Sequence, residues 1–401
     1  MPEEMRSHRH VIETARRAVE LYGYDEVATP IFEFSQVFER TLGEASDIVT
    51  KEMYSFSDKG GDVITLRPEN TAGVARCFIS EGLVQQVPVR FFYAGPMFRH
   101  ERPQKGRQRQ FHQVGIELIG LAQPQADIEV IAAGVRALDA LSVLDKTVLE
   151  INTLGDPESR EAYRGVLVDY FSRHIDALSE DSRARLARNP LRILDSKDEG
   201  DRRIVAGAPL FADYLNAASI EFFDRVKAGL AALGIAYELN PRLVRGLDYY
   251  CHTAFEFTTT ALGAQGTVLA GGRYDGLIRI MGGPDTPGVG WAAGVERLAM
   301  LCGAAPAQRR PVALVPVGPA AEAEAIKLAE RLRGAGLRVD LAYSGNLGRR
   351  MKRANRIDAA ASVLVGEDEL ARGVATVRNM DTGTQDEVAM TSLEEYLARY
   401  R

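Results

Sequence analysis

The stretch that decides the fold is residues 89–120, which read VRFFYAGPMFRHERPQKGRQRQFHQVGIELIG. Both ends are rich in aromatic or β-branched residues, which favour strands, and a charged, glycine-containing loop lies between them. Because side chains alternate between the two faces of a strand, the returning strand has one mostly apolar face and one polar face. The polar face carries Phe111, Gln113, Gly115 and Glu117. The pattern therefore predicts a β-hairpin with one face too polar to be ordinary core.

Charged side chains crowd the turn of this predicted hairpin. The outgoing strand ends at Arg99 and Glu101, and the loop adds Arg102, Lys105, Arg107 and Arg109. Such a loop is most often a solvated edge. The polar face below the loop indicates a binding site instead. A carboxylate buried without a partner is costly, so Glu117 suggests a polar ligand. A cationic hairpin above a polar face is a place where a polyphosphate could lie.

Length and composition limit the possible functions. The 401 residues are enough for two or three domains with a sizeable core. The net charge of −6 excludes a bulk electrostatic footprint for nucleic acid, so any polyanion must be met by local patches. The three cysteines are far apart, which indicates a reducing compartment rather than a disulfide framework. No signal peptide or long apolar run is present, so we expect a cytoplasmic protein.

The six histidines include no HExxH pattern. His100 and His112 could face each other across the hairpin, but we expect no protein-bound metal.

Glu69 follows the strand-like VITLRP at a junction with a helix, which Asn70 or Thr71 can cap. A carboxylate there either reads a ligand or is a helix-end charge favoured by the dipole.

The chain before residue 303 predicts an α+β domain. We expect a helix over 3–22 and a strand pair around Lys59–Gly61. We also expect a proline-bearing strand over 27–33, which is either a plain edge strand or one at a domain boundary or subunit interface. Further expected elements are a helix over 126–142, a strand over 146–155, a helical insertion over about 156–240, strands over 243–259 and a following hairpin, and a glycine-spaced turn that enters a helix over 288–301.

The chain after residue 302 changes character. Residues 303–310 are linker-like, and residues 311–401 alternate between strand and helix patterns, which predicts a small α/β domain with a partly parallel sheet. One of its helices, NLGRRMKRANR at 346–356, carries Arg349, Arg350, Lys352, Arg353 and Arg356 within its turns. This basic helix is either a solvated face or a contact to a phosphate backbone.

Arginine side chains are the candidate functional groups that remain after other kinds of site are excluded. The sequence has no GxxxxGK[ST] loop, no GxGxxG after a strand, and no Ser-His-Asp or Cys-His arrangement. Arg99, Arg245 and Arg297 lie in predicted strands, junctions or helices, although Arg297 could simply snorkel from an apolar helix. Guanidinium groups bind phosphate oxygens in two-point geometry. If a substrate carboxylate attacks a nucleotide, fixed cations offset the repulsion and no protein nucleophile is required.

Five segments together resemble the bacterial type of histidyl-tRNA synthetase, a class II family. They are TLRPENTAGVAR at 65–76, FRHERPQKGRQRQFHQVGIELIG at 98–120, VRGLDYY at 244–250, AGGRYDGL at 270–277 and GVGWAAGVERL at 288–298. The resemblance implies an α+β catalytic domain over 1–302, with an antiparallel sheet flanked by helices and a helical insertion, followed by an α/β anticodon-binding domain over 311–401. Asn70 departs from the family's usual glycine, and Cys251-His252 from its usual Asn-Arg.

The resemblance also implies roles in ATP binding. Arg99 would hold the α-phosphate, Arg297 the γ-phosphate, and Phe111 would stack on adenine, with Glu101 and Arg107 completing the site. ATP would be a substrate that carries its own Mg²⁺.

For histidine, the resemblance implies a site with three parts. Arg245 would be the catalytic cation between the histidine carboxylate and the α-phosphate. Glu69 and Thr71 would hold the amino group with help from Gln113, and Glu117, Tyr250 and Tyr274 would surround the imidazole. A neutral imidazole has one donor and one acceptor, which a carboxylate and a phenol can satisfy.

The implied macromolecular partners are tRNA(His), with Arg349, Arg350, Lys352 and Arg353 as candidate contacts, and a second copy of the chain in a homodimer. The alternative is a non-catalytic, synthetase-like regulatory subunit of ATP phosphoribosyltransferase. Such paralogues typically lack the anticodon domain and lose signature residues, whereas Glu69, Arg99, Arg245 and Arg297 are present here.

Overall fold

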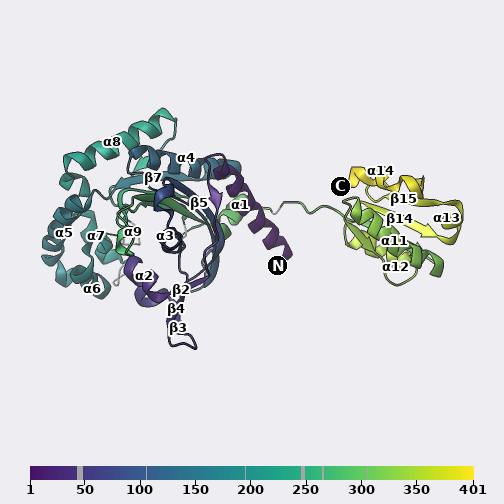
Figure 1. Cartoon of the computed structure of the whole chain (residues 1–401), viewed down its shortest axis with the longest axis horizontal. Helices are drawn as coiled ribbons and strands as arrows, with labels where there is room; N and C mark the ends of the chain where they lie inside the picture. The colour runs from purple at the N-terminus through teal and green to yellow at the C-terminus, as the bar shows by residue number, and fades with distance from the viewer. Residues whose placement is uncertain (43–47, 105, 195, 245–248, 264–265, 305) are drawn as a thin grey trace. The chain divides into compact units, whose positions relative to one another are not determined.

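The computed structural model describes residues 1–42, 48–104, 106–194, 196–244, 249–263, 266–304 and 306–401. They divide into two compact units, Met1–Ala305 and Pro306–Arg401 (Figure 1). Each unit has its own sheet and its own buried core.

In the described part of the chain, the first unit is built on an eight-stranded sheet of order β1-β5-β6-β11-β10-β9-β7-β8. Neighbouring strands are antiparallel except at the edges, where β1 pairs with β5 and β7 with β8 in parallel. The strands are β1 (Asp25–Glu26), β5 (Val89–Phe98), β6 (Gln110–Ile119), β7 (Val148–Thr153), β8 (Glu238–Leu239), β9 (Cys251–Thr258), β10 (Thr267–Arg273) and β11 (Gly288–Gly294). The predicted hairpin, β5–β6, lies within this sheet, and the predicted, mostly antiparallel sheet is confirmed.

The stretch from Gly288 to Gly294 corrects one prediction. It is not a turn but a strand between β6 and β10, and only Val295–Cys302 forms the helix α10. The glycines recur with the period of a strand: Gly288, Gly290 and Gly294 share one face, while Val289 and Trp291 are buried on the other.

Helices cover the apolar face of the sheet. They are α1 (Pro2–Glu20), α4 (Pro124–Ala140), α8 (Ala217–Ala232) and α10, and Figure 1 shows α4 and α8 over this side. The core between them includes Val114, Ile116 and Leu118 from β6, as the alternation of that strand predicts. Packing on this face fixes the position of the hairpin and therefore of the polar side chains on its opposite face.

The other face is bordered by α2 (Ser35–Leu42), α3 (Thr71–Ser80) and α9 (Leu277–Ile280), with a small antiparallel sheet of β2 (Phe32–Phe34), β4 (Val63–Leu66) and β3 (Tyr54–Ser57). The predicted strand over 27–33 is wrong for most of its length, because of these residues only Phe32 and Glu33 lie in a strand, β2, while β1 ends before them in the other sheet. Between β1 and β2, the carbonyls of Thr29 and Pro30 accept hydrogen bonds from the Arg67 guanidinium instead of from a neighbouring strand.

The predicted insertion is helical, but it is not one body. Helices α5 (Pro157–Ser172), α6 (Glu180–Arg188) and α7 (Glu199–Ala206) surround a small core around Tyr163, Leu167 and Phe171. By contrast, α8 places Phe223, Val226 and Leu230 in the main core against α4. Its apolar face therefore belongs structurally to the sheet.

The second unit has a sheet of order β13-β12-β14-β15-β16 among its described residues. Its strands are β12 (Val312–Val317), β13 (Val339–Leu341), β14 (Ala361–Gly366), β15 (Val374–Asn379) and β16 (Gln385–Ala389), and its helices are α11 (Pro319–Gly334), α12 (Leu347–Arg356), α13 (Glu367–Arg372) and α14 (Leu393–Leu397). The first three strands are parallel and the last two antiparallel, which confirms the predicted partly parallel sheet. No described helix of either unit has the length and apolar character needed to cross a membrane.

Candidate active site

A cavity of about 210 Å³ opens on the polar face of the β5–β6 hairpin. Its walls come from β6, β10, β11, the start of α3 and the start of α10. Nine residues singled out from the sequence line it: Glu69, Thr71, Arg99, Glu101, Arg107, Phe111, Gln113, Tyr250 and Arg297. Segments far apart in the sequence therefore meet at one hollow.

Glycines make the cavity possible. A Cβ atom added at Gly290 would lie 2.0 Å from Oε2 of Glu117, and one at Gly115 would lie 2.4 Å from the Tyr93 ring. At Gly272 it would lie 2.8 Å from the Tyr250 ring. Any larger residue at these positions would displace a side chain at or behind the cavity wall, and of the three only Gly290 offers its bare backbone to the cavity.

Two arginines of the cavity are oriented by backbone carbonyls. Arg99 Nε donates to the Pro68 carbonyl at 2.9 Å, and its guanidinium carbon lies 5.4 Å from the centre of the Phe111 ring. Arg297 Nε donates to the Gly106 carbonyl at 3.1 Å and its Nη1 to the Thr267 carbonyl at 2.7 Å. Carbonyls fix the direction of a guanidinium without neutralising its charge, so Arg99 remains able to attract an anion.

The electrostatics of this cluster also favour an anion. Burial lowers the pKa of Arg297, and the neighbouring cations Arg107 and Arg99 lower it further, while Glu101 opposes them. Arg107 is itself paired with Glu101 at 3.2 Å. Like charges gathered in one hollow repel one another, and a polyphosphate would relieve that repulsion.

Glu69 caps the helix that borders the cavity. Its carboxylate accepts hydrogen bonds from the backbone N–H groups of Thr71 at 2.6 Å and Ala72 at 2.9 Å. Asn70 occupies the N-cap position, as predicted, but its side chain does not cap the helix, because its Oδ1 instead accepts a hydrogen bond from Thr29 at 2.6 Å. Burial raises the pKa of Glu69, although these hydrogen bonds oppose the shift.

Glu117 lies behind the cavity wall and not on it. It is 1% exposed, and its two oxygens accept hydrogen bonds from Thr71 Oγ1 at 2.7 Å and from the Tyr274 hydroxyl at 2.5 Å. Neither Glu117 nor Tyr274 lines the cavity, but Gly290 does, and it lies against the carboxylate. Burial raises the pKa of Glu117 to about 8, against the effect of the two hydroxyl donors. This carboxyl group therefore changes charge near neutral pH.

Of two further predicted site residues, the structure describes Tyr250 but not Arg245. Tyr250 lines the cavity beside Tyr249, and its carbonyl accepts a hydrogen bond at 2.8 Å from Arg160 of the insertion helix α5. Arg245, the predicted catalytic cation, lies outside the described residues.

The comparisons with known proteins agree with this geometry. A family model for histidyl-tRNA synthetase matches residues 1–298, and a model for an anticodon binding domain matches residues 311–400. The chain belongs to the histidyl-tRNA synthetase family. It is 65% identical to a histidine–tRNA ligase of Rhodospirillum rubrum, over 100% of this chain and 97% of the relative. It is 58% identical to one of Gluconacetobacter diazotrophicus, over 98% and 94%.

Solved structures give the same result. The apo histidyl-tRNA synthetase of Staphylococcus aureus superimposes with a TM-score of 0.83 at 34% identity, covering 99% of this chain and 96% of that one. A Bacillus halodurans protein described as an ATP phosphoribosyltransferase regulatory subunit/histidyl-tRNA synthetase has a TM-score of 0.64 at 22% identity, over 88% and 93%. That second likeness shows the fold alone. The regulatory alternative therefore has no support beyond the fold it shares with synthetases.

Tyr93 and Tyr249 line the cavity but were missed from the sequence. The register of the synthetase hairpin explains Tyr93, which pairs with Gly115 and so lies on the face of Gln113 and Glu117. The alternation of side chains along β6 identifies that face. Extending the same alternation to β5 would have predicted Tyr93 as a residue of that face. For Tyr249, the sequence held the signal only within the family segment VRGLDYY.

In the anticodon-binding domain, the predicted tRNA contacts on α12 divide into two groups. Arg350 is 5% exposed and bonded to Glu322 and to the Pro316 carbonyl, and Arg353 pairs with Asp340 at 2.7 Å. Arg349 and Lys352 are exposed. Arg350 is therefore corrected to a structural residue, because burial leaves its guanidinium no access to a phosphate.

Proposed function

We propose that this chain ligates L-histidine to tRNA(His) in two steps at the cavity. The carboxylate of histidine attacks the α-phosphorus of ATP, which gives histidyl-adenylate and diphosphate. A hydroxyl at the 3′ end of tRNA then takes the histidyl group and releases AMP. Family membership and the full-length relatives support the overall reaction. Among the described residues, the observation that carries it at atomic level is that Arg99, Arg297 and Glu69 line one hollow.

In the first step, the two carbonyl-oriented arginines bind the triphosphate. Arg99 faces the α-phosphate, Arg297 the γ-phosphate, and Phe111 stacks on adenine, while the Glu101–Arg107 pair borders the nucleotide. Because the two arginines are already held in place, little reorganisation is required as charge moves onto the α-phosphate oxygens. Mg²⁺ arrives with the nucleotide. Arg245 completes the set as the cation between the carboxylate and the α-phosphate, a role that rests on the family resemblance.

Histidine enters with its amino group toward Glu69, Thr71 and Gln113. Oε1 of Gln113 is buried and has no hydrogen-bond partner among the described residues, so an incoming ammonium group would satisfy it. The imidazole then lies over Gly290 and reaches Glu117, with Tyr250 and Tyr274 around it. To accept an imidazole N–H, Glu117 would exchange its bond to the Thr71 hydroxyl for one to the ligand. A site that satisfies both ring nitrogens rejects amino acids that lack them.

For tRNA, we assign adenylation to residues 1–302, anticodon reading to residues 311–401 and the linker to residues 303–310. Exposed Arg349 and Lys352 on α12 are the proposed phosphate contacts. Deleting residues 311–401 should spare adenylation and impair charging. Equal loss of both would contradict the assignment.

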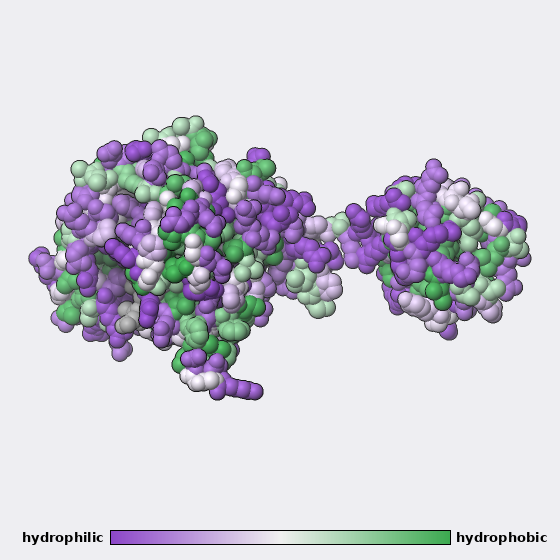
Figure 2. Space-filling model, viewed as in Figure 1, coloured by the Kyte–Doolittle hydropathy of each residue, from purple (hydrophilic) through white to green (hydrophobic). Residues whose placement is uncertain are grey.

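We also propose a homodimer, in which a second copy covers the small β2-β4-β3 sheet. Figure 2 shows hydrophobic surface over this protruding sheet, where Phe32 and Phe34 are 54% and 58% exposed and Phe56 and Val63 are also exposed. Exposed aromatic side chains in one patch mark an interaction surface. Sedimentation of a Phe34→Lys variant should give a lighter species than wild type. The proposed compartment is the cytoplasm, which fits three free cysteines.

The experiment that tests the reaction is exchange of labelled pyrophosphate into ATP, measured with histidine and with several other amino acids. We expect exchange with histidine well above the blank without amino acid. A folded chain that exchanges only at the level of the blank would contradict the proposal, and equal exchange with a second amino acid would contradict the imidazole site.

A further inference from the structure

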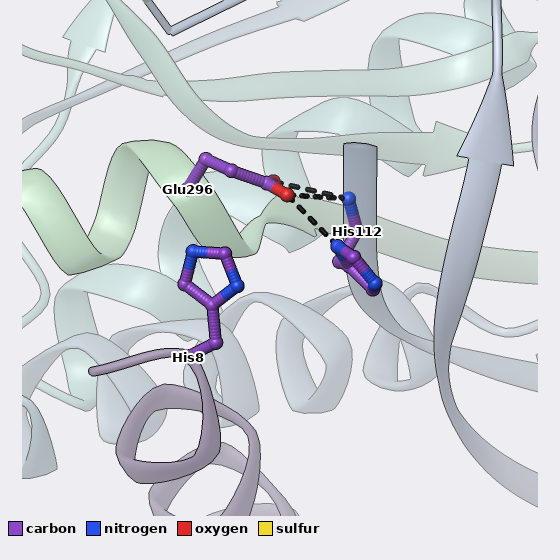
Figure 3. Close-up of side chains that lie close together, drawn as sticks. All are labelled: His8, His112 and Glu296. Carbon is purple, nitrogen blue, oxygen red and sulfur yellow. Dashed lines mark hydrogen bonds and ion pairs between the residues drawn. The ribbon is translucent and has the colours of Figure 1, made fainter. Parts of the chain in front are cut away.

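Three potential metal ligands meet beside the cavity, and one of them, Glu296, also lines it. His8 comes from α1, His112 from β6 and Glu296 from α10, and Figure 3 shows them converging from these separate elements. One ligand atom of each lies within 4.8 Å of the other two. Among the residues that the structure describes, no other group of three or more such side chains comes this close.

Within the described part of the chain, His8 is the member of the trio that has an unsatisfied buried ring nitrogen. It is 7% exposed, and its Nδ1 atom is buried with no hydrogen-bond partner among the described residues. Its ring lies 5.7 Å from that of His112, and in Figure 3 it extends from α1 toward the other two side chains. A buried polar atom without a partner is costly, so the position indicates a missing ligand.

Glu296 and His112 are already arranged as a pair. Both carboxylate oxygens accept from the backbone N–H of His112 at 3.0 Å, and Oε1 lies 2.9 Å from Nδ1 of its ring. The cluster thus holds a carboxylate fixed beside two imidazoles.

We propose that His8, His112 and Glu296 bind a divalent transition-metal ion of the zinc class. Two imidazole nitrogens and one carboxylate oxygen, with water in a fourth position, are a common tetrahedral donor set for Zn²⁺, whereas Mg²⁺ prefers oxygen donors and keeps its waters. The ion would replace the proton between His112 Nδ1 and Glu296.

The geometry requires little movement. Adjacent ligands of a tetrahedral zinc ion at its usual bond lengths are roughly 3.3 Å apart. The Glu296 oxygen and His112 nitrogen, 2.9 Å apart, are already close to that separation. Only the His8 ring has to move in, by rotation of its side chain from α1. This site departs from the expectation of no protein-bound metal, because the sequence does not show that α1 packs against β6 and α10.

A bound ion would link the N-terminal helix to both halves of the nucleotide site. His112 follows Phe111 on β6, and Glu296 precedes Arg297 on α10. Binding to the folded chain alone stabilises it by mass action, so metal should raise the melting temperature. The inference stands on these side chains and not on the proposed reaction, because binding and melting are measured without substrates.

The test uses the full chain after removal of bound metal with a chelator. Co²⁺ serves as a visible-absorption probe, and Zn²⁺ as its competitor. His8→Gln is compared with His10→Gln, which alters an exposed histidine of the same helix. We expect one Co²⁺ per chain, displaced by Zn²⁺ but not by Mg²⁺, in wild type and His10→Gln. Loss of an outer-shell partner typically costs about 10- to 100-fold in affinity, so His8→Gln should lose at least that much.

Several results would overturn the proposal. They are the absence of Co²⁺ binding to the folded wild type, equal affinity of His8→Gln and wild type, or equal losses in His8→Gln and His10→Gln. X-ray absorption of the Zn²⁺-loaded wild type needs no variant and covers the case in which His8→Gln fails to fold. Imidazole and oxygen neighbours are expected, and sulfur neighbours would place the ion on a cysteine instead.

Discussion

One arginine of the cavity and two arginines of helix α12 show two ways of holding a charge. Arg99 donates to a backbone carbonyl, which orients it and leaves its charge in place. Arg350 and Arg353 instead pair with Glu322 and Asp340. A charge held by neutral partners stays available to a ligand, whereas a charge held by an opposite charge is mainly structural.

The carboxyl groups follow the same division. Glu117 is held by two hydroxyl groups and Glu69 by two backbone N–H groups, and burial raises the pKa of both. Asp340, in contrast, faces a guanidinium. Two carboxyl groups whose pKa burial raises therefore lie at or just behind the cavity, which is where a functional site would place them.

The largest expected effect separates the two kinds of arginine. Arg99→Gln should slow histidine-dependent pyrophosphate exchange by about 10²- to 10³-fold, or about 2.7–4 kcal/mol, because it removes a fixed cation from the developing charge. Arg353→Gln, the matched control from α12, should exchange like wild type. If Arg99→Gln changed only the affinity for histidine, or if Arg353→Gln lost as much rate, the distinction would be wrong.

Next in size is the pH dependence that comes from Glu117. Its pKa is about 8 in the folded chain and 4.5 ordinarily, so between these values the folded state binds more protons than the unfolded state. The stability from this group is complete below about pH 4.5 and falls as the pH rises toward 8, by at most about 1.4 kcal/mol per unit. Denaturant melts of Glu117→Gln should show a flatter decline than wild type.

A matched change tests whether that slope belongs to the cavity. Asp340→Asn removes a carboxylate that is paired with Arg353 and should keep the slope of wild type over the same interval. Identical slopes in wild type and Glu117→Gln would mean that the carboxyl group is not held neutral by its surroundings.

A smaller effect is expected from adding a methyl group to the bare backbone of the sheet at Gly290. Gly290→Ala places a methyl group 2.0 Å from the Glu117 carboxylate, and overpacking of this kind costs about 1–3 kcal/mol. Histidine binding, measured by calorimetry, should weaken more than ATP binding. Gly165→Ala in α5 has nothing within 4 Å of the added carbon and should leave binding unchanged. Equal loss of both ligands in Gly290→Ala would argue against an imidazole lying there.

The smallest effect concerns the exposed cations of α12. Arg349→Ala and Lys352→Ala should each weaken tRNA binding slightly and reduce its salt dependence by about one unit of slope per lost phosphate contact. Arg350→Ala should leave that slope unchanged, because its guanidinium is bonded inside the domain. A slope that responds to Arg350 and not to Arg349 would reverse the division proposed for this helix.

Local patterns in the sequence predicted much of this arrangement. The alternation of β6 assigned Gln113 and Glu117 to a polar face, and the strand–helix alternation after residue 311 predicted the second sheet. The resemblance assigned the cavity residues their roles. What failed depended on contacts between distant segments. The burial of Arg350 depends on Glu322 of a neighbouring helix, and β11 is a strand because β6 and β10 pair with it on both sides.

Glu69 and Glu117 show the same limit at the site. The sequence left Glu69 open between a ligand contact and a helix-end charge and indicated a ligand near Glu117. The cap on α3 and the depth of Glu117 behind Thr71 arise from how α3 packs against the sheet. The trio of His8, His112 and Glu296 was not predicted either, since its members are joined only by tertiary packing.

The central claim is that cations for a triphosphate and a deep slot for imidazole open into one cavity. A crystal structure with a non-hydrolysable histidyl-adenylate analogue tests it most directly. We predict the phosphate-like group within hydrogen-bond distance of Arg99, and an imidazole nitrogen bonded to Glu117 in place of the Thr71 hydroxyl. An analogue bound with its imidazole away from Glu117, or with its phosphate away from Arg99, would contradict the claim.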